Sequence, residues 1–197
     1  MAYGAEELRG EFGRLIRDFC TALAKNGMVA VIPDYFSATG TAPGLNSAFA
    51  PANDQERWVV VLKDAVANTF PGTAPGRTAL VGFSLGGHLA LKAAIGPSAK
   101  AVVDFFGPLA TGGSAITSAT AMPPVQIHHG EDDSIVVFSN SVTLDAWLNS
   151  ESIVHEFHRY PGNGHPGQEL VAKPPGWSTQ AQSDATTASV QFLAAHI

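Results

Sequence analysis

The stretch Gly82-Phe83-Ser84-Leu85-Gly86 has the form G-x-S-x-G and stands between an apolar run, residues 78–81, and an alanine-rich run, residues 87–95. The first run predicts a short buried strand, and the second predicts a helix that ends before a Gly-Pro pair. A strand, a sharp turn and a helix together are typical of a nucleophile elbow, in which a serine hydroxyl stands exposed at the tip. We expect small residues at Gly82 and Gly86 because the strand and helix backbones nearly touch there.

Apolar strands and amphipathic helices alternate on both sides of this motif. Residues 12–25, for example, place their apolar side chains on one helical face at three- and four-residue spacing. Further helices are expected at residues 53–69, 139–148 and 178–196, strands at residues 28–33, 101–106, 124–128 and 153–160, and loops at residues 38–52 and 109–122. Strands that alternate with helices imply right-handed crossovers. The sequence therefore predicts an α/β fold with a mostly parallel, doubly wound sheet flanked by helices.

The composition limits the classes of protein that fit. The chain has 197 residues, 45% of them hydrophobic, which suits one domain over residues 1–197 with a full core. The net charge is −6 and Lys and Arg form no cluster, so no nucleic-acid partner is expected. No apolar run approaches the length of a membrane span. Residues 1–11 lack the apolar core of a signal peptide and Cys20 is the only cysteine, so we expect a cytoplasmic protein without an intrachain disulfide.

An exposed serine hydroxyl is a poor nucleophile, and it needs a histidine to take its proton and a carboxylate to orient that histidine. In doubly wound hydrolases the acid and then the histidine follow the serine along the chain, each in a loop after a strand. Here residues 129–136 follow one predicted strand and residues 161–165 follow the next. Both loops lie at carboxyl ends of strands, where such sheets bind ligands. Ser84 and His165 are therefore the expected nucleophile and base.

Three acids in the first of these loops compete for the orienting role. Asp133 is preferred because it stands at the end of the turn and points back over the sheet, whereas Asp132 is the next candidate and Glu131 is expected to be a solvated charge. His128 and His129 are adjacent at the junction of strand and loop, so they point to opposite faces. No third ligand follows them at a suitable spacing, and we expect neither a metal site nor a cofactor.

The oxyanion that forms in acyl transfer needs two backbone N–H donors. One donor is expected from Leu85, directly after the nucleophile, and the other from the loop before the first helix, residues 7–10. The two long predicted loops are expected to border the substrate pocket. Candidates for its apolar walls are Phe36, Phe83 and Trp177.

Segments along nearly the whole chain resemble the dienelactone hydrolase family of the α/β-hydrolase fold. The segments that carry this resemblance are, in chain order, Glu7-Leu8-Arg9-Gly10, residues 28–35, residues 82–88, Phe105-Phe106-Gly107, residues 129–136 and residues 160–165. The resemblance implies a catalytic triad formed by Ser84, Asp133 and His165. It also implies that Leu8 and Leu85 supply the oxyanion hole.

The chain departs from this family in two ways. Ser84 stands where the family's dienelactone hydrolases carry a cysteine, so a general carboxylester hydrolase is expected rather than a specialised dienelactone enzyme. The chain also begins shortly before the oxyanion loop, so the N-terminal strands of the fold are expected to be missing, and an exposed sheet edge of that kind favours a homodimer. Glu7 nevertheless corresponds to a family glutamate that contacts the nucleophile, which implies a place for it in the substrate site.

The leading hypothesis from the sequence is a serine hydrolase that cleaves small carboxylic esters through an acyl-enzyme intermediate. Lactones, thioesters and short peptides are the alternative substrates. An alternative of a different class is a binding protein that has kept the fold and lost turnover, because its oxyanion loop is truncated.

Overall fold

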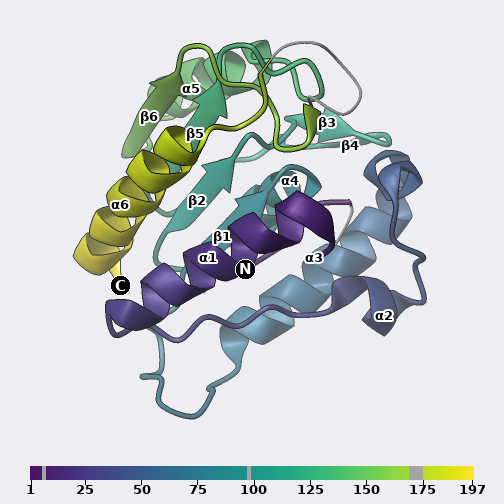
Figure 1. Cartoon of the computed structure of the whole chain (residues 1–197). Helices are drawn as coiled ribbons and strands as arrows, with labels where there is room; N and C mark the ends of the chain where they lie inside the picture. Colours follow the sequence, from purple (N-terminus) through teal and green to yellow (C-terminus); the bar gives the residue numbers. More distant parts are fainter. Residues whose placement is uncertain (6–7, 97–98, 169–174) are drawn as a thin grey trace.

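The computed structural model describes residues 1–5, 8–96, 99–168 and 175–197. Its central sheet has four parallel strands in the order β1 (Leu80–Phe83), β2 (Val102–Phe105), β5 (Val125–Gly130) and β6 (His155–Tyr160). Helices α1 and α6 cover one face of the sheet, and α3, α4 and α5 cover the other (Figure 1). This arrangement confirms the predicted parallel sheet with helices on both faces.

The remaining elements surround this sheet. The α-helices are α1 (Gly10–Lys25), α2 (Tyr35–Thr39), α3 (Ala52–Ala67), α4 (Leu85–Ala94), α5 (Ser139–Ser150) and α6 (Thr179–His196). A 3₁₀ helix spans Leu45–Phe49, and β3 (Ala110–Thr111) and β4 (Ser114–Ala115) form a small antiparallel pair. None of the helices in the described part of the chain combines the length and the apolarity needed to cross a bilayer.

The sheet forms the middle of the hydrophobic core. Every residue of β1, β2 and β5 is buried, as expected for parallel strands covered on both faces, whereas β6 at the edge is partly exposed. Phe83 of β1 and Phe105 of β2 stack with their ring centroids 4.5 Å apart, and Phe19 of α1 packs edge-on against both rings. The aromatic side chains of α1 and the sheet thus fix this helix beneath the carboxyl ends of the strands.

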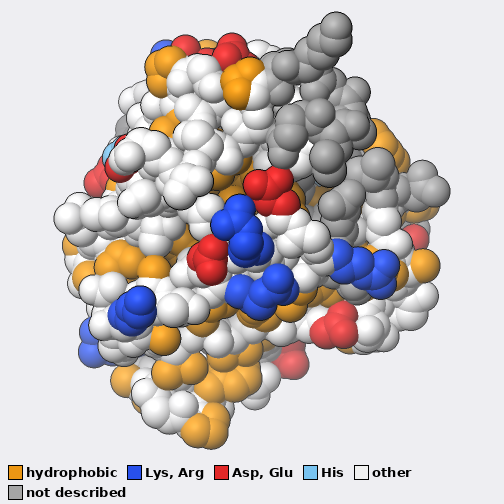
Figure 2. Space-filling view, viewed as in Figure 1, with side chains coloured by type: hydrophobic (Ala, Val, Ile, Leu, Met, Phe, Trp, Pro, Cys, Tyr) orange, Lys and Arg blue, Asp and Glu red, His pale blue; other side chains and the backbone are white. Residues whose placement is uncertain are grey.

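Charged side chains lie scattered on the surface of α1. Arg14 forms ion pairs along the helix with Glu11 at 3.5 Å and with Asp18 at 3.8 Å. On the part of this face that is not drawn in grey, Lys and Arg side chains are interspersed with Asp and Glu (Figure 2). These exposed pairs contribute little to stability, but they keep this face free of a broad patch of one sign.

One predicted strand is absent. Residues 28–33, expected to form a strand because they are apolar, have no strand structure, and Val29 is 50% exposed. The segment runs beside Met1, whose amine donates to the carbonyl of Val31 at 2.6 Å, but Ala2 then directs its backbone hydrogen bonds to β1. The prediction is wrong because an apolar run does not by itself supply the partner backbone that a strand needs.

The segments predicted as loops contain short regular structure that the sequence pattern did not predict. The first includes the 3₁₀ helix, and the second includes the β3–β4 pair. Helix α2 begins at an Asp34 side chain that accepts a hydrogen bond from the N–H of Ser37 at 3.0 Å. Elements of two to five residues are too short for periodicity to predict.

The turn between β1 and α4 brings two backbones into direct contact. A Cβ atom at Gly82 would lie 2.0 Å from the carbonyl oxygen of Gly86, and a Cβ atom at Gly86 would lie 2.3 Å from the carbonyl oxygen of Ala2. Ser84 lies between these glycines with φ 55°, a conformation that residues with a side chain rarely adopt. The close approach predicted from the two glycines is therefore confirmed.

Replacing Gly82 with alanine should lower the free energy of unfolding by about 3 kcal/mol, because the new methyl group forces β1 and α4 apart. Urea denaturation measures this loss. The control is Gly76→Ala, since Gly76 has φ +72° but open space around it, and backbone strain alone should cost about 1 kcal/mol. Equal losses in the two variants would show that crowding at the turn does not require glycine.

A carboxyl group is buried beneath the first turn of α4. Asp104 on β2 has no exposed surface, and its Oδ1 accepts a hydrogen bond from the N–H of Gly107 at 3.1 Å. Its Oδ2 has no hydrogen-bond partner among the residues that the structure describes. Burial raises the pKa of Asp104 to about 7, even though the charge of His129 and the Gly107 N–H act in the opposite direction.

This raised pKa predicts that stability declines as the pH rises. The folded chain, with a pKa of about 7 at buried Asp104 against an ordinary 3.8, binds more protons than the unfolded chain. Between pH 5 and pH 8 the wild type should lose roughly 2–3 kcal/mol of its free energy of unfolding through this group, and Asp104→Asn should not. Urea denaturation of both proteins at the two pH values measures the difference. The same pH dependence in both proteins would contradict the prediction.

Candidate active site

Ser84 stands at the turn between β1 and α4, at the carboxyl end of the sheet. Its N–H donates to the carbonyl of Phe105 on β2 at 2.9 Å, and its own carbonyl accepts from the N–H of Gly87 at 2.8 Å, which begins α4. The positive φ of Ser84 turns its side chain out of the plane of the strand. The residue is half-buried, so its hydroxyl lies in a partly enclosed site.

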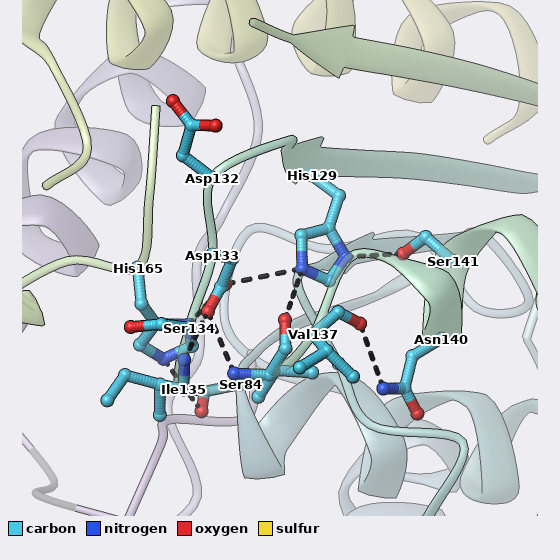
Figure 3. Close-up of polar contacts among 12 residues, drawn as sticks. Ser84, His129, Asp132, Asp133, Ser134, Ile135, Val137, Asn140, Ser141 and His165 are labelled. Carbon is cyan, nitrogen blue, oxygen red and sulfur yellow. Dashed lines mark hydrogen bonds and ion pairs between the residues drawn. The ribbon is translucent and has the colours of Figure 1, made fainter. Parts of the chain in front are cut away.

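The serine hydroxyl lies at one end of a chain of hydrogen bonds (Figure 3). The Nε2 atom of His165 is 3.1 Å from Ser84 Oγ, and its Nδ1 atom is 2.7 Å from Oδ2 of Asp133. Because a carboxylate only accepts, Nδ1 carries a hydrogen, and Nε2 is left to accept from the serine hydroxyl. This arrangement can move a proton from the hydroxyl to the imidazole while the carboxylate stabilises the imidazolium.

The Asp133 carboxylate is buried and surrounded by N–H donors. Its Oδ1 accepts hydrogen bonds from the N–H groups of Ile135 and Val136, each at 2.8 Å. Burial acts to raise the pKa of Asp133, but the hydrogen bonds and charges of His129 and His165 lower this pKa to about 2. The carboxylate therefore stays ionised at neutral pH, as the orientation of His165 requires.

The two other acids of this loop do not reach the site. Asp132 and Glu131 are both exposed. Figure 3 shows the Asp132 side chain directed away from the hydrogen bonds that join Ser84, His165 and Asp133. The structure thus brings one of the three candidate acids to the histidine.

His165 is held by aromatic rings and by a glutamine that the sequence analysis did not identify. Its ring lies 4.8 Å from the ring of Phe106 and 6.0 Å from that of Phe12, measured between centroids. The Oε1 atom of Gln168 accepts from the N–H groups of His165, at 3.2 Å, and of Ser134, at 2.6 Å. Gln168 therefore joins the histidine loop to the acid loop, although its position in a Gly-rich turn gave no signal of this role.

The two predicted oxyanion donors differ in how far the structure describes their surroundings. The N–H of Leu85 belongs to the first turn of α4, where helices leave their N–H groups without intrahelical partners. Leu8 lies in the turn before α1, and its carbonyl accepts from the guanidinium of Arg17 at 2.9 Å. Its N–H follows directly on residues 6–7, which lie outside the described residues, so the donor role of Leu8 stays a prediction. Glu7 itself lies outside the described residues.

Two of the three aromatic residues expected in the pocket walls belong to the core. Phe36 and Phe83 have no exposed surface. Phe36 packs edge-on against Trp58 on α3 and against Tyr3, so its ring is enclosed by other core side chains. Trp177 is 8% exposed and packs against Phe106, the ring that contacts His165, so it remains a candidate for the wall of the site.

The paired histidines at the end of β5 have unrelated surroundings, as their predicted opposite orientation requires. His128 is hydrogen-bonded to Tyr160 and Ser189, whereas His129 lies beside Asp133, with its Nε2 atom 3.2 Å from Oδ2. Within the described ranges, no group of three His, Cys, Asp or Glu side chains could hold a metal ion. The sequence pattern indicated His129 only as a possible metal ligand and gave no sign of its contact with the acid.

A cleft of about 390 Å³ lies away from this constellation. Residues 26–31, residues 72–74, residues 77–81 and Ile197 contribute to its lining, and Ser84, Asp133 and His165 do not. It opens near the amino end of β1. Parallel sheets bind ligands at the carboxyl ends of their strands, where Ser84 lies, so we place the candidate active site there and not in the cleft.

Comparison with solved structures shows the α/β-hydrolase fold. A dienelactone hydrolase-like promiscuous phosphotriesterase, P91, from metagenomic libraries is similar with a TM-score of 0.71 at 17% identity, over 98% of this chain and 83% of that chain. MGS-M1, an alpha/beta hydrolase from a Medee basin deep-sea metagenome, has a TM-score of 0.61 at 20% identity, over 90% of this chain and 76% of its own. An acetyl ester-xyloside bifunctional hydrolase from Caldicellulosiruptor lactoaceticus has a TM-score of 0.61 at 19% identity, over 90% of this chain and 75% of that chain.

Sequence comparison gives the family. No curated protein sequence matches the chain. The model of the dienelactone hydrolase family, however, matches residues 5–197, nearly the whole length. The chain that folds around Ser84, Asp133 and His165 therefore belongs to the dienelactone hydrolase family.

Proposed function

We propose that this protein is a serine hydrolase that cleaves small carboxylic esters through an acyl-enzyme intermediate, without a cofactor. The observation that carries the proposal is the hydrogen-bonded line from Ser84 through His165 to Asp133, with distances of 3.1 and 2.7 Å. Both contacts are short enough for proton transfer and for orientation of the base. The line stands at the carboxyl ends of the strands, where a substrate can reach Ser84.

In the proposed reaction, Ser84 Oγ attacks the ester carbonyl carbon while Nε2 of His165 takes the hydroxyl proton. The C=O double bond becomes a C–O⁻ bond, and this oxyanion accepts hydrogen bonds from the N–H of Leu85 and, as the second proposed donor, of Leu8. When the carbonyl re-forms, the ester C–O bond breaks, and the imidazolium returns its proton to the leaving alkoxide. The product alcohol departs and leaves an acyl group on Ser84.

Water completes the reaction by the same route. His165 takes a proton from a water molecule as its oxygen attacks the acyl-enzyme, and the Ser84 oxygen then leaves with that proton. Asp133 keeps its negative charge throughout, because its pKa, which the hydrogen bonds from both histidines hold down against burial, is about 2. The products are a carboxylic acid, an alcohol and the original enzyme.

The surroundings of Ser84 favour a small, apolar acyl group. Ile135, two residues after Asp133, presents an apolar side chain that is 49% exposed, whereas Phe106 and Phe12, which pack on the ring of His165, are buried. Asp133, the acid next to Ile135, already accepts hydrogen bonds from four N–H groups of the protein. Its carboxylate therefore faces these donors and not the substrate. An uncharged ester with a short or aromatic acyl group suits such a wall.

The first test is covalent labelling with a fluorophosphonate probe, read by mass spectrometry of the intact protein. We expect a single adduct on the wild type and none on Ser84→Ala, because only an activated serine reacts at a useful rate. A wild type that takes up no probe would exclude an activated Ser84 and favour a binding protein with this fold. An adduct that persists in Ser84→Ala would place the nucleophile elsewhere.

The role of the acid is tested by hydrolysis of an activated aryl ester. Asp133→Asn should lower kcat by on the order of 10⁴-fold, because the amide favours the wrong tautomer of His165 and does not stabilise the imidazolium. Asp132→Asn is the matched control, since it changes the neighbouring, exposed acid in the same way and should leave kcat unchanged. Comparable losses in both variants would refute the assignment of Asp133.

A further inference from the structure

His129 is the one buried histidine among the described residues that contacts Asp133 without approaching the serine. It is the fifth residue of β5, has no exposed surface, and extends from the strand toward the acid loop. Its Nε2 atom is 2.8 Å from the carbonyl oxygen of Val136 and 3.2 Å from Oδ2 of Asp133 (Figure 3). Its Nδ1 atom is 2.6 Å from Oγ of Ser141 on α5.

These contacts fix which nitrogen carries the hydrogen. The carbonyl oxygen of Val136 only accepts, so Nε2 of His129 donates, and its hydrogen lies between this carbonyl and Oδ2 of Asp133. Oγ of Ser141 is the partner of Nδ1, so both ring nitrogens are satisfied. Ser141 thus acts on His129 as Asp133 acts on His165, by fixing the orientation of the ring.

The carboxylate of Asp133 needs support on the side that His129 occupies. Its two backbone donors, the N–H groups of Ile135 and Val136, both bind Oδ1. Neither of these bonds reaches Oδ2, so the position of Oδ2 depends on its own partners. Oδ2, which faces His165, is held by His165 itself and by His129. Of these two, His129 alone stands on a sheet strand and is anchored at its far nitrogen.

We propose that His129 is a positioning residue, which holds Oδ2 of Asp133 in the place where it orients His165 and stabilises the imidazolium. The inference rests on the proposed function, because it assigns His129 a part in that reaction. His129 touches neither Ser84 nor the place of the reacting ester, so it acts through Asp133 alone. Its removal lets Oδ2 move away from Nδ1 of His165, which weakens the base and slows the proton transfer.

Several groups face His129 from the elements packed around it, and they limit the variants that can test its role. Asp133 faces it from the acid loop and Asp104 from β2, while Ser141 contacts it from α5. The rings of Phe106 and Phe138 pack edge-on against the imidazole at 6.4 and 5.6 Å between centroids. An aromatic ring therefore suits these surroundings, and phenylalanine, whose ring is somewhat larger than imidazole, removes the hydrogen bonds of His129 without leaving a cavity.

The test compares His129→Phe with His129→Gln in ester hydrolysis between pH 5 and pH 8. His129→Phe should lower kcat about tenfold with KM within about twofold, and should move the acid limb of the rate profile about one pH unit lower, because the imidazolium loses a charged hydrogen-bond partner. In His129→Gln the amide nitrogen stands near the place of Nε2 and can donate to the same two oxygens. It should restore kcat to within about threefold of the wild type, with an unshifted limb.

The matched control is His128→Phe. His128 precedes His129 on β5, is equally buried, and makes its hydrogen bonds on the opposite face of the sheet. This variant should lower Tm but leave the acid limb in place. If His129→Phe also leaves the limb in place and loses kcat only in step with Tm, His129 has a structural role and the proposal is overturned. A limb that moves to higher pH overturns it too, since His129 would then compete with His165 for Oδ2.

A measurement without turnover separates this proposal from the proposed function. The titration of the His165 ring, followed by NMR in the wild type, His129→Phe and His128→Phe, should move to lower pH in His129→Phe alone. The shift would support the positioning role even if no ester were hydrolysed, whereas an unshifted titration would refute it. If His129→Phe does not fold, Ser141→Ala takes its place, and a smaller shift in the same direction is expected because only the anchor of Nδ1 is removed.

Discussion

The close contact between β1 and the first turn of α4 fixes the position of Ser84, the proposed nucleophile. The backbones meet at Gly82 and Gly86, and Gly87 lies so close to the sheet that a Cβ atom there would come within 2.1 Å of the Asp104 carboxyl. With three positions restricted to glycine, the chain reverses from strand to helix through Ser84 alone, at φ 55°. This strain in one residue is sustained by the packing of two whole elements.

The partners of Ser84 come to it through the register of the parallel sheet. β5 and β6 are neighbours and end at the paired residues Gly130 and Tyr160, so the loops that follow them begin side by side. Backbone contact continues into these loops, where the N–H of Asp132 donates to the carbonyl of Asn163 at 2.9 Å. Two side chains 32 residues apart in the chain thus meet at 2.7 Å because two strands end at the same level.

The sequence predicted those parts of the structure that depend on chain order and failed where neighbours in space matter. The order of serine, acid and histidine, each after an apolar run, together with the place of Asp133 in its turn, predicted the three side chains that meet in the structure, Ser84, Asp133 and His165. Apolarity could not distinguish a strand from an irregular, partly exposed segment at residues 28–33, nor a pocket wall from the core at Phe36. Gln168 and His129 were beyond reach, because their roles depend on the distance between loops that only the folded sheet fixes.

Two buried carboxyls near the site show how the fold controls its charge. Burial acts to raise the pKa of both, but Asp133 accepts hydrogen bonds from four N–H groups and has a pKa of about 2, whereas Asp104 accepts one and has a pKa of about 7. The hydrogen bonds and charges of the two histidines therefore keep Asp133 ionised at a pH below 7, where Asp104 binds a proton. The negative charge is then held by the carboxyl that contacts His165, and a protonated Asp104 does not draw the imidazolium away from Ser84. His129 contacts Asp133 directly, and its charge acts to lower the pKa of Asp104. It therefore interacts with both buried carboxyls.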